Sequence, residues 1–243
     1  SCGGDNTVRV FALTDKGDAT PERTVKFDGE ADAIRFDAAA KRVYVGHGHF
    51  LGSFSVETGE RGPSVKLPGA PEGFVLDPAT NKVWVNIASL GQIATLERGE
   101  GGEMKITGTV TLKDAKGNYP MAYDPGSGHM IVVCRNPAKL VVIDAKDGTE
   151  VASMPVLDDA DDCWWDNMLK RVYVSCGGGG GAVEIFQQGK GADGKVSYAK
   201  YHQEKTNVGC RTSVWVPEQR RLVVAAPSLG ADPTFLYIYF VGP

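Results

Sequence analysis

Residues that can bind ligands recur at two matching positions along this 243-residue chain. The first position carries a polar or charged side chain in every copy: Asp32, Glu72, Tyr119, Asp161 and Arg211. The second position follows fifteen residues later and carries His47, Ile87, Cys134, Cys176 and Ala226. Thiols and imidazoles favour zinc or copper, and carboxylates can complete such a shell. The two sets therefore indicate either a polar ligand site or a metal site.

The metal hypothesis rests on five side chains as ligands of a divalent ion: His47, His49, Asp161, Cys134 and Cys176. His47 and His49 are the one close pair, because the sequence has no Cys-x-x-Cys or His-x-x-x-His spacing. Cysteine is also a small apolar residue that packs well in sheets, so its recurrence is equally explained by duplication of a repeat. We favour this second interpretation, and the identity of any cofactor stays open.

Both sets are positioned by a repeated pair of short apolar segments. An apolar residue followed by Asp, or by Val in the last copy, leads across a short polar turn into a second apolar run. The second runs are residues 41–45 (KRVYV), 81–85 (NKVWV), 129–133 (HMIVV), 171–174 (RVYV) and 220–224 (RRLVV). The constant offset is typical of a tight β-hairpin. No long segment has apolar residues at a helical period, so we expect an all-β chain.

The spacing of these hairpins indicates propeller blades. Their anchor positions, 37, 77, 124, 166 and 216, are separated by 40, 47, 42 and 50 residues. We therefore predict a single domain over residues 1–243, an all-β propeller of four-stranded antiparallel blades. We expect five blades, with an N-terminal strand completing the last one, or six or seven if the chain is a fragment. The predicted repeats are 1–31 (partial), 32–71, 72–118, 119–160, 161–210 and 211–243.

This architecture would bring the two sets of side chains to one rim. In a blade the first strand starts where the second strand ends, so members of the two sets should face each other. The expected pairs are Asp32 with His47, Glu72 with Ile87, Tyr119 with Cys134, Asp161 with Cys176, and Arg211 with Ala226. They would surround one mouth of a central channel, where propellers commonly bind ligands. A channel mouth can also be too wide for metal–ligand distances of about 2 Å.

Composition and charge exclude several classes of protein. The formal net charge is −4, from 30 acidic and 26 basic residues, so we expect no nucleic-acid partner. No apolar run approaches the roughly 18 residues that span a bilayer, so we expect no transmembrane segment. The sequence begins at Ser1 without an initiator Met, and we expect that a preceding segment was removed.

Five cysteines leave at least one thiol without a disulfide partner in a monomer. Cys163 and Cys210 lie near the starts of successive predicted first strands, so they are the pair to test for a disulfide. Burial of the cysteines as thiols is the interpretation that we favour.

Residues 171–174 (RVYV), 82–85 (KVWV) and 5–11 (DNTVRVF) resemble the YVTN family of bacterial β-propeller repeats, which is similar to NHL-type propellers. The resemblance covers essentially the whole chain, and it implies a periplasmic, secreted or surface protein. Some relatives of this family are lactonases, lyases or cofactor-bearing subunits. The chain departs from the family pattern after the second strand, where the usual Asn is replaced by His47, Ile87, Cys134, Cys176 and Ala226.

Two functions are consistent with these patterns. The first, which we favour, is an exported scaffold that binds a protein or a small-molecule ligand through a polar ring of Asp32, Glu72, Tyr119, Asp161 and Arg211. The second is a metal-assisted lactonase or hydrolase with a divalent ion at the channel mouth. In that case His47 or a carboxylate would act as a base toward a bound water. The sequence leaves the substrate, the partner and the presence of catalysis open.

Overall fold

The structure is a computed structural model, which describes residues 1–230 and 233–242. The fold class is the predicted one, an all-β propeller with five antiparallel blades. The chain divides into two compact units, Ser1–Leu112 and Lys113–Pro243. In the described residues the only helical segments are four short 3-10 turns: η1 (Gly3–Asp5), η2 (Ala88–Leu90), η3 (Glu100–Gly102) and η4 (Pro217–Gln219).

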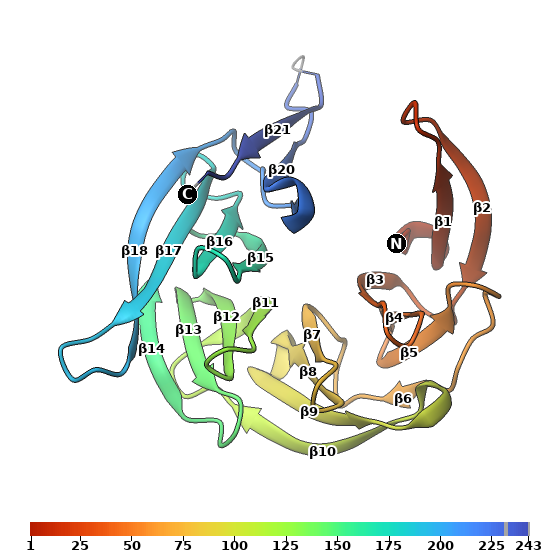
Figure 1. The fold of residues 1–243 in the computed structure, drawn as a ribbon, viewed down its shortest axis with the longest axis horizontal. Helices are drawn as coiled ribbons and strands as arrows, with labels where there is room; N and C mark the ends of the chain where they lie inside the picture. Colours follow the sequence, from red (N-terminus) through yellow and green to blue (C-terminus); the bar gives the residue numbers. More distant parts are fainter. Residues whose placement is uncertain (231–232, 243) are drawn as a thin grey trace. The chain divides into compact units, whose positions relative to one another are not determined.

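The unit Ser1–Leu112 holds an N-terminal hairpin and two four-stranded blades (Figure 1). The hairpin pairs β1 (Thr7–Leu13) with β2 (Ala19–Lys26). The first blade consists, in sheet order, of β3 (Ala31–Asp37), β4 (Arg42–His47), β5 (Phe50–Ser55) and β6 (Val65–Lys66). The second blade consists of β7 (Phe74–Asp77), β8 (Lys82–Ile87), β9 (Gln92–Arg98) and β10 (Met104–Thr111).

The unit Lys113–Pro243 holds the other three blades. The third blade consists of β11 (Lys116–Asp124), β12 (His129–Asn136), β13 (Ala138–Asp144) and β14 (Glu150–Pro155). The fourth consists of β15 (Ala160–Asp166), β16 (Arg171–Cys176), β17 (Ala182–Lys190) and β18 (Val196–Lys205). The fifth shows three strands in the described residues: β19 (Ser213–Val216), β20 (Arg221–Ala226) and β21 (Phe235–Phe240).

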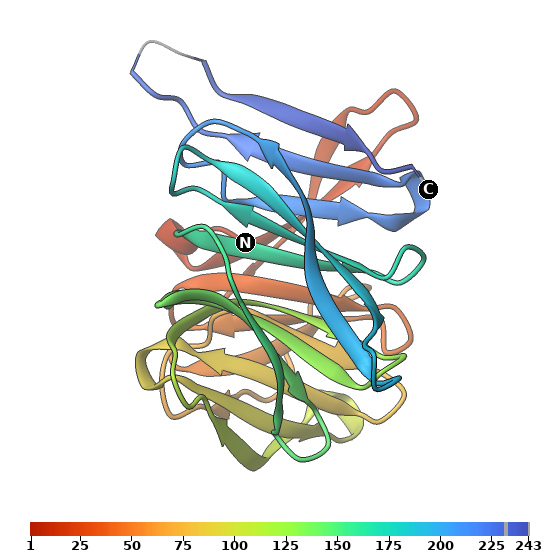
Figure 2. The same cartoon turned by 90° about the vertical axis from the view of Figure 1, so that its left-hand side faces the viewer.

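Blades of one unit pack face to face, with their first strands as neighbours (Figure 1). β3 lies beside β7, while β15 lies beside both β11 and β19. The second strand of a blade is covered on both faces, as the burial of β8 from Val83 to Ile87 shows. The fourth strand is the most exposed, as in β10. Figure 2 shows the twist of the sheets, most clearly where β17 and β18 cross the view.

The repeated Asp of the sequence pattern builds the turn between the first two strands. The carboxylate of Asp37 accepts hydrogen bonds from the backbone N–H groups of Ala39 (2.9 Å) and Ala40 (3.1 Å). Asp166 accepts equivalent bonds from Met168 (2.9 Å) and Leu169 (3.2 Å). Asp and Asn side chains stabilise turns in this way because they satisfy backbone donors that the strands leave free.

Four residues after each anchor the backbone adopts the left-handed conformation. The residues are Lys41 (φ 50°), Asn81 (φ 58°), Gly128 (φ 71°), Lys170 (φ 55°) and Arg220 (φ 55°). Such a residue closes a short hairpin loop in register with the second strand. The last copy keeps this residue although its anchor is Val216, because the 3-10 turn η4 replaces the carboxylate. The constant offset in the sequence is therefore a constant turn geometry.

The anchor carboxylates also connect neighbouring blades within a unit. Arg98 of the second blade pairs with Asp37 of the first. Arg220 of the fifth blade forms two hydrogen bonds with Asp166 of the fourth, at 3.1 and 3.0 Å. The interfaces also contain clusters of buried apolar side chains. One Asp thus fixes a turn and a contact between two sheets.

Several features of the chain as a whole are still predictions. The single domain, its repeat boundaries and the completion of the last blade by an N-terminal strand stay predictions. No helix of the described residues is long and apolar enough to span a membrane. The cysteines are present as thiols, so Cys163 and Cys210 do not form the disulfide that was to be tested. Burial as thiols, the favoured interpretation, is confirmed for all except the half-buried Cys2.

Candidate functional site

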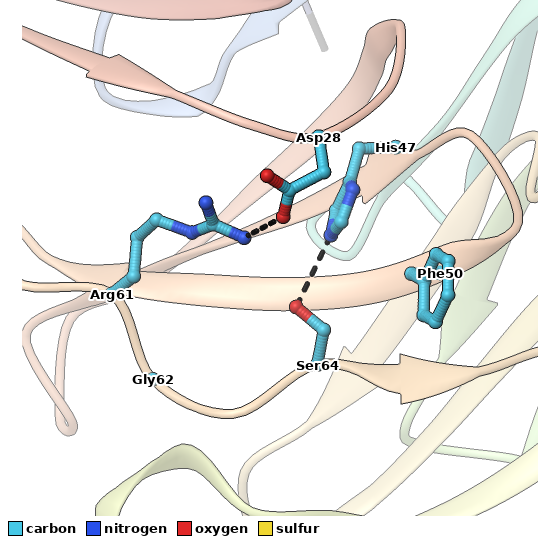
Figure 3. A pocket seen from close by; sticks show the side chains of 6 residues that line it. All are labelled: Asp28, His47, Phe50, Arg61, Gly62 and Ser64. Atoms are coloured by element: carbon cyan, nitrogen blue, oxygen red, sulfur yellow. Dashed lines mark hydrogen bonds and ion pairs between the residues drawn. The ribbon is translucent and has the colours of Figure 1, made fainter.

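One candidate site is a cavity of about 520 Å³ in the unit Ser1–Leu112. We call it the His47 pocket, and it is lined by Asp28, His47, Phe50, Arg61, Gly62 and Ser64. His47 ends β4 and Phe50 begins β5, so a tight turn presents both rings. Arg61, Gly62 and Ser64 belong to the loop between β5 and β6. Figure 3 shows Arg61 directed at Asp28 and His47 directed at Ser64.

His47 is fixed by packing and by one hydrogen bond. His47 is 2% exposed, and its Nε2 lies 3.2 Å from Oγ of Ser64. The ring stacks on Phe50, with centroids 5.7 Å apart and planes inclined by 17°. A Cβ added to Gly52 would lie 2.6 Å from Ser64 Oγ and 3.0 Å from His47 Nε2. The glycine therefore leaves the space that this hydrogen bond occupies.

The other ring nitrogen of His47 indicates which tautomer is present. Among the described residues, Nδ1 is buried and has no hydrogen-bond partner. A buried donor without a partner is rarer in proteins than an acceptor without one. We therefore assign the proton to Nε2, which donates to Ser64 Oγ. The Ser64 hydroxyl then keeps its own proton to donate to a molecule in the pocket, because Ser64 is exposed.

Two opposite charges stand beside the imidazole. Nη2 of Arg61 lies 2.7 Å from Oδ2 of Asp28, and the guanidinium stands 4.9 Å from the ring centroid of Phe27. Burial lowers the pKa of His47, the charge of Arg61 lowers it further, and Asp28 acts in the opposite direction. The hydrogen bond from Arg61 lowers the pKa of Asp28. At neutral pH the pocket therefore holds a neutral imidazole and one ion pair.

The predicted ligand residues of the unit Lys113–Pro243 lie together at one rim. Asp161 accepts a hydrogen bond from Arg135 Nη2 at 2.7 Å, and Arg211 Nε lies 3.5 Å from Asp161 Oδ2. Arg211 also pairs with Asp159 at 2.8 Å. The guanidinium of Arg135 stands 4.0 Å from the centroid of the Tyr119 ring. The structure thus brings the predicted residues Tyr119, Asp161 and Arg211 together. We use the name charged rim for the group of five residues: Tyr119, Arg135, Asp159, Asp161 and Arg211.

Arg135 and Asp159 are the two members of the charged rim that the sequence reasoning missed. Arg135 follows Cys134 directly, and Asp159 stands in the acidic run 158–162. An arginine directly after the repeated position Cys134, together with this acidic run, was a sequence signal that could have predicted the ion pair. The charges balance within the rim, so its groups satisfy each other and connect three successive blades.

The expected facing of the two repeated sets is wrong by one residue in three of the five predicted pairs. His47 pairs with Ala31, Cys134 with Asn118, and Cys176 with Ala160. An irregularity follows each of these pairs in the first strand, where the register shifts. Because side chains alternate between the faces of a strand, a shift of one residue turns the predicted partner to the other side. His47, Cys134 and Cys176 are consequently buried, whereas Asp32 is exposed and Tyr119 is half-buried.

The predicted metal ligands have other surroundings. Cys134 and Cys176 are 1% and 0% exposed, and burial raises the pKa of the Cys134 thiol to about 12. Burial also raises the pKa of Cys176. His49 is exposed. Of the predicted polar ring, Asp32 is exposed and Glu72 is half-buried. In the part of the chain that the structure describes, no group of three or more His, Cys, Asp or Glu side chains could hold an ion. The metal hypothesis therefore gains no support from the ligand geometry.

Solved structures with a similar arrangement of strands come from proteins with different names. A proposed 6-phosphogluconolactonase of Bacteroides uniformis matches with a TM-score of 0.75 and 13% identity, over 92% of this chain and 72% of that protein. The Pseudomonas aeruginosa periplasmic gluconolactonase PpgL matches with a TM-score of 0.67 and 11% identity, over 83% and 64%. Kuenenia stuttgartiensis hydrazine synthase matches with a TM-score of 0.68 and 14% identity, over 88% and 63%.

These likenesses, at 11–14% identity, establish that the chain has a β-propeller fold. The likenesses do not identify an activity, because one fold supports many unrelated activities. In comparisons of sequence, no protein-family model and no curated protein matches the chain. The resemblance to YVTN repeats therefore stays a prediction.

Proposed function

We propose that this protein is an exported β-propeller scaffold that binds a small polar ligand in the His47 pocket. One observation carries the proposal: a cavity of about 520 Å³ in which an ion pair and a serine hydroxyl stand beside an aromatic wall. Ligand sites commonly combine a few placed polar groups with apolar walls. Export is supported by the YVTN resemblance and by the likeness to a protein named as periplasmic.

The pocket chemistry favours a neutral ligand with several hydroxyl groups. Arg61 and Asp28 carry opposite charges, so an ion of either sign would meet both attraction and repulsion. A hydroxyl group can accept from Arg61 or Ser64 and donate to Asp28. Phe50 offers an apolar face next to these groups. A sugar-like ring has both hydroxyl groups and an apolar face, and it is the ligand class that we propose.

Calorimetric titration of the purified protein with glucose and with gluconolactone tests this proposal. We expect saturable binding of at least one probe, weakened about tenfold by Phe50→Ala and by Ser64→Ala. Phe36→Ala is the matched control, because Phe36 is an exposed aromatic residue of β3. If both pocket variants bind as well as the unchanged protein, the His47 pocket is not the binding site. If neither probe binds, the ligand is not of the proposed sugar-like class.

Hydrolysis of a lactone is the second candidate, favoured by the contact between His47 and Ser64 and by the names of two structural neighbours. His47 would take a proton from water as the water oxygen attacks the lactone carbonyl. It would then return that proton to the ring oxygen as the carbon–oxygen bond breaks, giving a hydroxy acid. This step requires the proton on Nδ1, so that Nε2 is open as a base. We propose the metal-free form, because no sufficient ligand group is present in the described residues.

Two measurements decide between binding and hydrolysis. Acid release from gluconolactone, followed against the rate without protein, reports turnover, and His47→Gln should abolish it. Nitrogen NMR of the imidazole reports the tautomer. Turnover with a proton on Nδ1 establishes the second candidate, whereas saturable binding without turnover and with a proton on Nε2 supports the scaffold.

Recognition of a protein at the predicted channel mouth remains the other form of the scaffold hypothesis. It would use the charged rim, in which Arg211 and Asp161 are partly exposed, with 46% and 37% of their side-chain surfaces accessible. The charged groups of the rim pair with one another, so fewer of them are available to bind a partner protein. We therefore rank the His47 pocket first.

A further inference from the structure

A second cavity, of about 490 Å³, is lined by residues of the first and second blades of the unit Ser1–Leu112. It is formed by the turn that follows β3, the turn that follows β7, and the glycine-rich segment that contains η3. Its walls carry two arginines, Arg42 and Arg98, together with Asp37 and Tyr44. Neither the sequence patterns nor the proposed sugar site uses this cavity. We call it the arginine cavity.

Arg98 is a buried cation with donor groups left over. Only 6% of its side-chain surface is accessible. Nη1 pairs with the carboxylate of Asp37, and Nη2 lies 3.4 Å from the carbonyl oxygen of Asp77. Nε is buried and has no hydrogen-bond partner among the described residues. The guanidinium stands 5.6 Å from the centroid of the Tyr44 ring.

Arg42 is held in a comparable state by two glycines. Its Nε donates to Ser53 Oγ at 3.1 Å, while Nη2 is buried without a partner in the described part of the chain. A Cβ on Gly102 would lie 2.8 Å from Arg42 Nε, and one on Gly62 would lie 2.5 Å from Nη2. The backbone of two separate loops thus leaves room for this guanidinium and fixes its position.

The two arginines and two acidic residues of the cavity wall balance in formal charge, but only one of the two carboxylates is buried. That carboxylate belongs to Asp37, which is 4% exposed and pairs with Arg98. Glu100, the remaining acidic residue of the lining, is an exposed residue of the segment that contains η3. Buried charges interact more strongly than exposed ones because solvent screens them less. Arginine presents a planar fork of donors that fits carboxylate and phosphate oxygens.

From this geometry we propose that the arginine cavity binds a small oxyanion, the carboxylate or phosphate group of a small molecule, between Arg42 and Arg98. The oxygens of such a group accept hydrogen bonds from the two guanidinium groups, whose donors Asp37 does not exhaust. The lining of this cavity shares no residue with that of the His47 pocket, although Gly62 of that pocket also lies against Arg42.

The test is a titration of the whole protein with inorganic phosphate and, separately, with acetate, at constant ionic strength maintained with chloride. Proton–nitrogen NMR of the arginine side chains reports contact through the Nε–H signals of Arg42 and Arg98. We expect saturable shifts of these two signals with at least one anion. The Arg9 signal should not move, because Arg9 lies in β1 of the N-terminal hairpin, where it pairs with exposed Asp5. The anion that binds more tightly identifies the ligand as a phosphate or a carboxylate.

Variants provide the second arm of the experiment. Arg42→Gln should weaken binding by about tenfold or more, and Arg9→Gln should leave it unchanged. Arg42→Lys keeps the charge without the fork and should show an intermediate loss, which preserves the test if Arg42→Gln fails to fold. The proposal is overturned if neither anion moves the Arg42 and Arg98 signals, or if binding to the Arg42 variants equals that of the unchanged protein.

Discussion

Burial and one hydrogen bond govern the chemistry of His47. Its ring lies between Phe27 and Phe50 with centroid distances of 4.8 and 5.7 Å, so few polar groups can solvate a second proton. The positive charge of Arg61 adds to this effect, and the lowered pKa follows. Ser64 stabilises the neutral ring by fixing Nε2. A neutral imidazole beside an exposed hydroxyl is suited to binding a polar ligand.

The lowered pKa of His47 predicts a specific dependence of stability on pH. The unfolded chain gains a proton at this side chain as the pH falls through about 6.5, before the folded chain does. The His47 contribution to the free energy of unfolding is therefore full above that pH and decreases as the pH falls through the lowered folded value. Urea unfolding between about pH 7.5 and pH 5 should show this decrease.

A matched pair of histidine variants isolates this contribution. His47→Gln should flatten the decrease in the free energy of unfolding, and His202→Gln should not, because His202 is an exposed histidine beside Glu204. An identical pH dependence in the unchanged protein and in His47→Gln would show that His47 does not titrate as described.

The hairpins and the contacts between blades follow from one residue type at one position. Asp37, Asp77, Asp124 and Asp166 each hold a turn through backbone N–H groups. The same carboxylates accept side chains from the next blade in three cases: Arg98 to Asp37, Gln188 to Asp124 and Arg220 to Asp166. These three turns are therefore anchored to a second sheet. The pattern explains why Asp recurs at this position in four of the five copies.

Removal of Arg220 should destabilise the unit Lys113–Pro243 strongly. Asp166 has a side chain that is 2% accessible, and it would lose its ionic partner while Tyr173 and two backbone groups stay in contact. Breaking a buried pair from one side costs about 3–5 kcal/mol. Arg211→Ala, in a partly exposed pair, should cost about 1 kcal/mol or less.

Urea unfolding of the two variants checks this difference. The transition midpoint of Arg220→Ala should fall well below that of Arg211→Ala. Equal midpoints would show that the contact between the fourth and fifth blades does not depend on the buried pair.

For the molecule as a whole, the sequence was a good guide to the architecture and a poorer guide to the site. Strand positions followed from the turn after Asp37 and its counterparts, because that turn is local. The pocket residues Arg61 and Ser64 were not predicted, since the loop after β5 reaches His47 only through its path in the fold. His47 was selected from the sequence, but its predicted partner Asp32 was displaced by the irregularity in β3.

The central claim is that the His47 pocket, and not the charged rim, is the small-ligand site. Backbone amide NMR of the whole protein, titrated with the sugar or lactone that binds in calorimetry, tests this claim most directly. The account predicts saturable shifts at Asp28, His47, Phe50 and residues 61–64, with little change at Arg135 and Arg211. Shifts concentrated at Tyr119, Asp161 and Arg211, with none around His47, would contradict it and place the ligand at the charged rim.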